Sequence, residues 1–395
     1  MKIPPDAHVR EVFYVGGETT KDPYDGTGIL HGQIYVEHLK PVVKPQKPVD
    51  LLEPRAPAQR IIFIPGSGRT SVDFLSPGRG LTDHGLLEPD RSKRSWASFF
   101  LSNSHTIYLI DPPFRGRSPF SPGLNYTTFP STQLAQAWFK SPQMHGDPLT
   151  MEHILASTYP QFIDLAEEQR LAQKGLVALL DRICPYKHVP NTPAFLLAHS
   201  MGAKAAWLVA DAKPKLVKGI IAVEPAGPPF RGVGVEMARY GITEAPINFA
   251  PEGELTVKEV DPGGPRKERK VPVLLQDESQ GEVKQLVNLK NIPVLVITSQ
   301  TSVHKGYDWG TVEFLKQSGV GNVEHVELED VGIEGNGHMM MLEGNRAEVG
   351  KVILDWMYKV DRESVLAEIS ATSNPELGKR GRESGVRLLQ KREGD

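Results

Sequence analysis

The chain has 395 residues, of which 39% are hydrophobic and 24% charged, and its formal net charge is −3. The weak negative charge gives no basis for a nucleic-acid or anionic-membrane partner, and a single cysteine, Cys184, excludes an internal disulfide. No apolar run approaches the roughly 20 residues that span a bilayer, and the N-terminal residues show no secretory leader pattern. We therefore expect a cytoplasmic protein that acts on a small molecule.

Short apolar runs bounded by turn residues predict strands, and segments with helical spacing lie between them. Because strands and helices alternate, the pattern predicts an α/β fold with a mostly parallel central sheet and helices on both faces. The first two strands are expected to form an antiparallel pair. The predicted strands are 11–15, 33–36, 60–66, 106–111, 193–200, 219–224, 293–299 and 323–328. The predicted helices are 161–184, 202–210, 311–317 and 347–359.

Two long segments, 119–160 and 226–289, interrupt this alternation. Structureless loops of that length are uncommon in a compact domain unless they have a function. Ligands of open α/β folds bind beyond the carboxyl ends of the strands. We therefore predict that residues 1–395 form a single domain in which both segments are insertions that form a cap or lid. The charged tail, 361–395, is expected to be a surface extension.

The serine in the sequence Ala198-His-Ser-Met-Gly202 is the strongest candidate for a catalytic residue. It lies between an apolar strand and a helix-forming segment, which is the context of a nucleophile elbow. In such a turn the serine hydroxyl is exposed at positive φ, and the residues two before and two after it must be small. Ala198 and Gly202 meet that requirement, so we predict that Ser200 is a nucleophile.

A serine nucleophile needs a base and an acid that orients the base. His338 is the candidate base because it lies in a glycine-rich loop after the last predicted strand. Glu224 is the favoured acid, since a carboxylate that closes an apolar strand is costly without a partner. Asp308, after the next strand, is the alternative acid, and Asp330 is a third candidate. His199, beside the serine, is expected to pack rather than to react.

The oxyanion that forms during acyl transfer needs two N–H donors. We expect them to be the backbone N–H groups of Met201, after the nucleophile, and of Ser67, with Gly68 as the next candidate. The loop around Ser67 has neither pattern of a phosphate-binding loop. No group of histidines and carboxylates has metal-ligand spacing, so neither a metal nor an organic cofactor is expected.

In this order, the serine, acid and histidine resemble those of the α/β-hydrolase superfamily, over roughly residues 11–360. The turn 111–118, Asp-Pro-Pro-Phe-Arg-Gly-Arg-Ser, adds to the resemblance, and its Arg115 and Arg117 are expected to pair with carboxylates. More narrowly, three segments resemble the bacterial esterase 713 group and its fungal relatives. These are Val-Phe-Tyr-Val-Gly-Gly-Glu at 12–18, Gly-Gln-Ile-Tyr-Val-Glu at 32–37 and Gly-Ile-Glu-Gly-Asn-Gly-His-Met-Met-Met-Leu-Glu at 332–343.

The esterase 713 group places its acid after the sixth strand, which supports Glu224. Its oxyanion loop carries a Cys-Cys pair where this chain has Ser67-Gly68, so the pocket chemistry is expected to differ there. Some fungal α/β-hydrolases open polyketide macrolactones, and the long insertions suit a bulky substrate. We therefore expect a carboxylic-ester hydrolase or lactonase acting on a bulky ester or macrolactone. An acyltransferase and a non-catalytic binding protein are the alternatives, and a homodimer is compatible with the sequence.

Overall fold

A computed structural model of the chain describes residues 4–22, 25–42, 58–75, 94–120, 126–127, 141–142, 154–184, 193–231 and 238–372. The chain divides into two compact units, Met1–Lys351 and Val352–Asp395. The sheet and the site discussed below belong to the first unit. The second unit contains most of the last helix, and its residues 373–395 lie outside the described residues.

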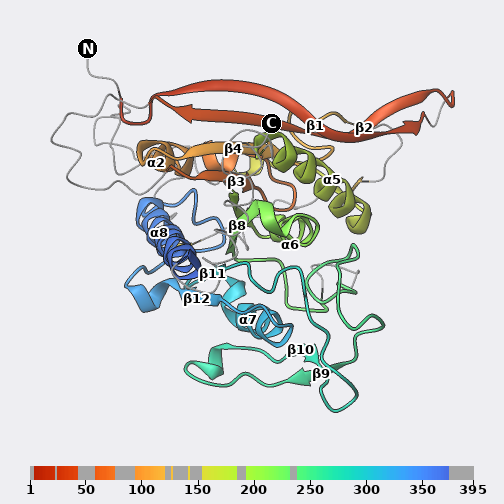
Figure 1. Ribbon diagram of the computed structural model, residues 1–395, viewed down its shortest axis with the longest axis vertical. Helices are drawn as coiled ribbons and strands as arrows, with labels where there is room; N and C mark the ends of the chain where they lie inside the picture. The colour runs from red at the N-terminus through yellow and green to blue at the C-terminus, as the bar shows by residue number, and fades with distance from the viewer. Residues whose placement is uncertain are drawn as a thin grey trace, which may run out of the picture. The chain divides into compact units, whose positions relative to one another are not determined.

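An eight-stranded sheet forms the centre of the first unit (Figure 1). The strand order is β1-β2-β4-β3-β7-β8-β11-β12; β1 and β2 pair antiparallel, β2 and β4 pair antiparallel, and all later neighbours are parallel. The mostly parallel sheet predicted from the sequence is therefore confirmed. Its strands are β1 His8–Lys21, β2 Gly28–Pro41, β3 Arg60–Ile64, β4 Thr106–Asp111, β7 Ala194–His199, β8 Val217–Val223, β11 Val294–Thr298 and β12 Val323–Glu327.

The N-terminal antiparallel pair is also confirmed, and each of its strands is 14 residues long. Its register pairs Glu11 with His38. Where this hairpin passes helix α5 (Leu165–Ile183), Gly16 has φ +73° and faces Gly175. A Cβ on Gly16 would lie 2.6 Å from the Gly175 Cα, so only glycine allows the strand and the helix to approach this closely.

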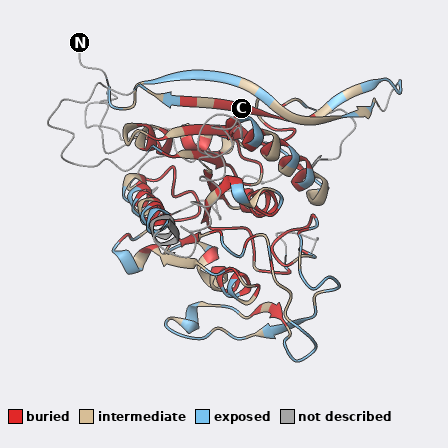
Figure 2. Ribbon diagram, viewed as in Figure 1, coloured by how far each residue is buried: buried red, intermediate tan, exposed pale blue. Residues whose placement is uncertain are grey.

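Helices cover both faces of the sheet, as the alternation predicted. Along the parallel strands, alternate residues such as Ile62, Leu196, Ile220 and Val294 join one buried cluster with side chains of α5, α6 and α7. On the other face Phe63 contacts Phe100 of α2, with ring centroids 5.8 Å apart. Figure 2 shows the inner strands β3, β4, β7, β8 and β11 almost entirely buried, whereas the outer strand β1 is exposed or half-buried and β12 is half-buried. Besides α5, the helices are α1 Val72–Leu75, α2 Trp96–Ser102, α6 Gly202–Ala212, α7 Asp308–Gln317 and α8 Arg346–Thr372.

The structure corrects several predicted boundaries and adds elements that the pattern did not predict. The first two strands and the last helix are longer than predicted, and the helix predicted at 311–317 begins at Asp308. The helix expected at 161–184 begins at Leu165, because the Asp164 side chain caps it by accepting from the Glu167 N–H at 2.9 Å. Residues Gln161–Phe162 instead form strand β6, which pairs with β5, Tyr126–Thr127. Helices α1 and α2 were not predicted. Further added elements are β9 Val257–Val260, β10 Val273–Gln276 and the 3-10 turns Pro214–Leu216, Lys267–Arg269, Val303–Gly306 and Leu328–Val331.

Much of the segment 226–289 is part of the main core. Its Phe230, Val273 and Leu286 are buried in the cluster shared with α6 and α7, and the Phe230 ring meets Phe314 edge-on. Inside this segment Glu244 pairs with the buried Lys204 of α6. At these positions the segment is scaffold, and its predicted role as a lid stays a prediction.

Within the described part of the chain, no helix combines the length and the apolar character that crossing a bilayer requires.

Candidate active site

Ser200 lies at a sharp turn between β7 and α6. Its φ is +52°, a value that non-glycine residues rarely adopt and that tertiary contacts must maintain. Here the Ser200 N–H donates to the Val223 carbonyl at 3.0 Å, and the Ser200 carbonyl accepts from the Ala226 N–H at 3.1 Å. A Cβ on Gly202 would lie 2.6 Å from two carbonyl oxygens, which explains why that position must be small. The turn therefore has the geometry expected of a nucleophile elbow.

His338 and Glu224, which lie 114 residues apart in the chain, form a buried hydrogen-bonded pair. The His338 Nδ1 donates to Glu224 Oε2 at 2.7 Å. The other carboxylate oxygen, Oε1, accepts from the N–H of Ser299 at 2.8 Å and from its hydroxyl at 2.5 Å. Burial raises the pKa of Glu224, but the His304 charge and the bonds from His338 and Ser299 lower it to about 2. Glu224 is therefore an anion at neutral pH.

The topology explains why these groups meet. Ser200 follows β7, Glu224 follows β8, and Ser299 follows β11, and these three strands are parallel neighbours. The carboxyl ends of parallel strands lie at one edge of a sheet, where active sites of open α/β folds form. The loop with His338 comes after β12, the next strand in the same order.

The other acid candidates have different partners. Asp308 Oδ1 bonds to the Nδ1 of His304 at 3.2 Å, and its Oδ2 accepts from the Thr298 hydroxyl at 2.7 Å. Asp330 forms an ion pair with Arg266 at 2.7 Å. The structure thus brings Glu224, and neither aspartate, into a hydrogen bond with His338.

The imidazole of His338 contacts two other histidine rings. The His199 ring is 4.5 Å from it, and the His304 ring stacks on it at 4.6 Å with an interplanar angle of 11°. The Nε2 of His199 donates to the His338 backbone carbonyl at 2.9 Å. Burial lowers the pKa of His199 well below its ordinary value, so this ring stays neutral and positions the His338 loop.

Sequence reasoning missed His304 and Ser299 as contributors to the site. Both lie in the loop after β11, at the same sheet edge as Glu224. Their position after a parallel strand was the available signal, because residues that follow neighbouring parallel strands lie at one edge of the sheet.

The loop after β3, which contains Gly66 and Ser67, passes close to Ser200. A Cβ on Gly66 would lie 2.9 Å from the Cβ of Ser200, so this loop passes directly beside the nucleophile. The Ser67 hydroxyl bonds to the Gln161 side chain, and Met201 is the N-cap residue of α6. These placements are compatible with oxyanion donors at Ser67 and Met201, and that role stays a prediction.

The predicted structural role of the turn 111–118 is confirmed. Arg115 pairs with Glu168 of α5 and donates to the Gly66 carbonyl at 2.6 Å. Arg117 bridges Asp111 at 2.8 Å and Glu37 at 2.5 Å. Arg115 therefore anchors the loop that passes beside Ser200.

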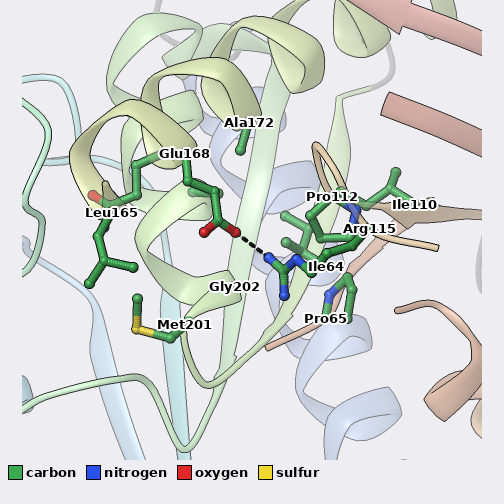
Figure 3. Close-up of a pocket in the computed structure, with 12 residues that line it drawn as sticks. Ile64, Pro65, Ile110, Pro112, Arg115, Leu165, Glu168, Ala172, Met201 and Gly202 are labelled. Carbon is green, nitrogen blue, oxygen red and sulfur yellow. Dashed lines mark hydrogen bonds and ion pairs between the residues drawn. The ribbon is translucent and has the colours of Figure 1, made fainter. Parts of the chain in front are cut away.

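Figure 3 shows a pocket whose lining includes the ion pair between Arg115 and Glu168. Its wall includes Met201 and Gly202, but Ser200, His338 and Glu224 are not among its lining residues. Arg115 lines this pocket and also bonds to the Gly66 carbonyl, so we interpret the pocket wall as part of the support of the elbow.

Among the described residues, one histidine–carboxylate group, Glu224, His304 and His338, brings candidate ligand atoms within 4.8 Å of one another. The lone pairs of imidazole nitrogens lie in the ring planes, and the two rings here are stacked almost parallel. Lone pairs in parallel planes do not converge on one ion. In addition, Nδ1 of each ring bonds to a carboxylate. The geometry of these three side chains therefore argues against a metal centre at this position.

Chelators test this interpretation. We expect EDTA to leave the ester hydrolysis predicted from the sequence unchanged within error, because the candidate ligand atoms do not converge on one cation. The measurement is the initial rate before and after EDTA treatment and dialysis. Inhibition that added Zn²⁺ reverses would contradict the metal-free mechanism.

The pH dependence follows from the environment of His338. A general base must be neutral. Burial and the neighbouring His304 charge disfavour the imidazolium and lower the His338 pKa below its ordinary value of about 6.5, against the opposing effect of Glu224. We expect kcat/KM to rise with pH through one acid limb with a midpoint below about 6.5 and then to level off. A limb above pH 7 would contradict this prediction.

Comparisons with known proteins place the chain among hydrolases. The sequence matches the family model "Alpha/beta hydrolase family" over residues 61–351. A curated relative, described as "Probable secreted lipase phiG" of Fungal sp. (strain ATCC 74256), is 35% identical over 366 residues. The match covers 87% of this chain and 91% of the relative. The solved structure of a novel bacterial esterase has a TM-score of 0.57 and 18% identity, and the match covers 89% of this chain and 96% of that one.

Proposed function

The chain belongs to the α/β hydrolase family, and from that premise we propose that it is a serine carboxylic-ester hydrolase with Ser200, His338 and Glu224 as its triad. The observation that carries the proposal is the 2.7 Å bond between His338 Nδ1 and the buried Glu224, at the same sheet edge as the elbow of Ser200. The relative described as a lipase and the bacterial esterase of similar fold support an ester substrate.

In the proposed reaction, the Ser200 hydroxyl attacks the ester carbonyl while His338 takes its proton. Glu224 accepts the Nδ1–H bond and stabilises the imidazolium that forms. The backbone N–H groups of Ser67 and Met201 bind the oxyanion. His338 then returns the proton to the leaving alcohol, which leaves an acyl-enzyme. Water attacks this ester, again with His338 as base, and the acid is released. For a lactone, the alcohol and the acid are two ends of one product.

A fluorophosphonate probe tests the nucleophile directly. The probe phosphonylates an activated serine, so we expect one modified peptide containing Ser200 and parallel loss of esterase activity. An unlabelled protein would support the binding-protein alternative. Transfer to an added alcohol with little hydrolysis would support the acyltransferase alternative. A panel of esters and lactones, followed by mass spectrometry, would then define the substrate class.

We further propose that the segment 119–160 is a lid over this site. Its described residues contact the loops on both sides of the site. The Ser141 hydroxyl bonds to Glu343 at 2.6 Å, and Glu343 accepts from the Gly337 N–H beside His338. At the other end, Arg69, in the loop after β3, donates to the Ile154 carbonyl at 2.7 Å. A lid that is anchored on these loops covers a large substrate, and we therefore propose a bulky ester or macrolactone as the substrate.

Shortening the lid tests its role. We expect replacement of residues 128–140 by a Gly/Ser linker to raise KM for bulky esters and lactones several-fold more than for an acetate ester, because a lid contacts only the larger acyl or alcohol group. A Gly/Ser replacement of the exposed turn 25–27, which lies between β1 and β2 and outside both predicted lid segments, is the control and should change neither KM. Equal losses on both substrates, with the fold retained by circular dichroism, would show that the segment is scaffold.

The relative's description as secreted applies to that protein. The cytoplasmic location expected from the sequence of this chain therefore stays a prediction, without support from the comparisons.

A further inference from the structure

A second imidazole–carboxylate pair lies against the proposed triad. After β11 the chain supplies Ser299 to Glu224 and then turns through Val303–Gly306 into α7. This turn places His304 on the face of the His338 ring, and Asp308 begins the helix behind it. The same loop therefore holds the acid of the triad and covers its base.

We propose that His304, charged through its pairing with Asp308, acts as a positioning residue that keeps the catalytic base His338 neutral and so extends hydrolysis to lower pH. This inference rests on the proposed function, because it assigns His338 the role of base.

The pairing of His304 is the first support. His304 is 5% exposed and Asp308 fully buried, and their Nδ1 and Oδ1 atoms are 3.2 Å apart. A buried carboxylate is costly unless a charge or hydrogen bonds compensate it. Burial raises the pKa of Asp308 to about 6. Burial lowers the pKa of His304, but the carboxylates of Asp308 and Glu224 outweigh that effect and raise it above its ordinary value. The pairing with Asp308 therefore favours the charged form of His304.

The stack with His338 is the second support. With ring centroids 4.6 Å apart and planes within 11°, the His304 ring stacks on the ring of the proposed base. A cation over a neutral aromatic ring is favourable, whereas two stacked cations repel each other. Protonation of His338 is therefore disfavoured. The same charge favours the anionic form of Glu224.

The other titratable groups around this stack do not supply that positive charge. Burial lowers the pKa of His325, which reaches Thr298, to about 4, so it is neutral near pH 7. His199, whose ring centroid lies 4.5 Å from that of His338, is neutral for the same reason. Burial raises the pKa of Tyr307, whose ring is 4.8 Å from His304, well above 10, and that of Glu343, beside the His338 loop, to about 7. Among the described histidines facing His338, His304 is the one whose pKa is raised, toward the charged form.

The consequence has a defined sign. As the pH falls, His304 becomes more fully protonated, and its repulsion of a proton on His338 is then greatest. The base consequently stays neutral to a lower pH than burial and Glu224 alone would allow. Removal of the His304 charge should move the acid limb of kcat/KM to higher pH.

Two variants and one control test the inference. The double variant His304→Phe/Asp308→Asn keeps a stacked ring, removes the charge and leaves no unpaired carboxylate. Asp308→Asn alone withdraws the main partner of the His304 charge. We expect both to move the acid limb upward by about one pH unit or more, with a smaller effect on the plateau rate. Tyr307→Phe alters the ring next to His304 without changing a charge and should leave the limb in place.

The readouts are the pH profile of kcat/KM and the NMR titration of the His338 ring. An upward shift of both in the charge-removing variants, but not in Tyr307→Phe, supports the proposal. An unmoved limb in a folded Asp308→Asn or double variant overturns it, since a purely structural role would lower activity equally at every pH. Failure of the proposed function is distinct, because wild-type protein would then show neither turnover nor labelling of Ser200.

Discussion

Ser200→Ala should abolish turnover while the protein folds and binds its substrate almost normally. The substitution removes only the hydroxyl that attacks the carbonyl. Loss of a triad nucleophile typically lowers kcat by about 10⁴–10⁶. Stability should change by no more than about 1 kcal/mol, because alanine fits the same turn and the backbone bonds from Ser200 to Val223 and Ala226 do not involve the side chain.

Steady-state kinetics on a small ester, together with thermal unfolding, measure both parts of this expectation. Ser102→Ala is the matched control, since its hydroxyl bonds only locally to Phe99 in α2, and it should retain wild-type activity. More than a tenth of wild-type kcat in Ser200→Ala would show that another group is the nucleophile.

The nucleophile elbow could be predicted because its requirements are local. A strand, a serine and a small residue at 202 are all visible within a few residues of sequence, and the φ of +52° agrees with them. The sheet was equally accessible, because strands covered on both faces appear as uninterrupted apolar runs. The order of those strands then places Glu224 and the loop of His338 at one edge.

Contacts that depend on packing between distant segments could not be predicted in this way. Nothing near His304 in the sequence shows that its ring stacks on a residue 34 positions later, because that stack depends on how the loops after β11 and β12 meet. Likewise, the segment 226–289 shows no periodicity, yet Val273 of β10 is fully buried and packs on Gly310 of α7. Shape complementarity between segments decides such contacts, and composition does not record it.

Glu224→Gln should reduce kcat by about 10³–10⁴ without unfolding the protein. The reason lies in the donors around the carboxylate. Oε1 accepts from both the N–H and the hydroxyl of Ser299, and Oε2 accepts from His338 Nδ1. The amide oxygen of a glutamine must face Ser299, because an NH₂ group there would meet the backbone N–H. The NH₂ group then faces Nδ1 of His338, which must become an acceptor.

His338 would then carry its proton on Nε2, the tautomer that cannot take a proton from serine, and the imidazolium would lose its counter-charge. Asp308→Asn is the matched control, because it also replaces a buried carboxylate by an amide, at the start of the helix that follows β11. At a pH on the plateau it should lower kcat less than about tenfold, since Asp308 bonds to His304 and not to His338. The comparison is kcat for both variants at that pH, with circular dichroism as the check of folding. A larger loss in Asp308→Asn than in Glu224→Gln would transfer the role of triad acid to the loop after β11.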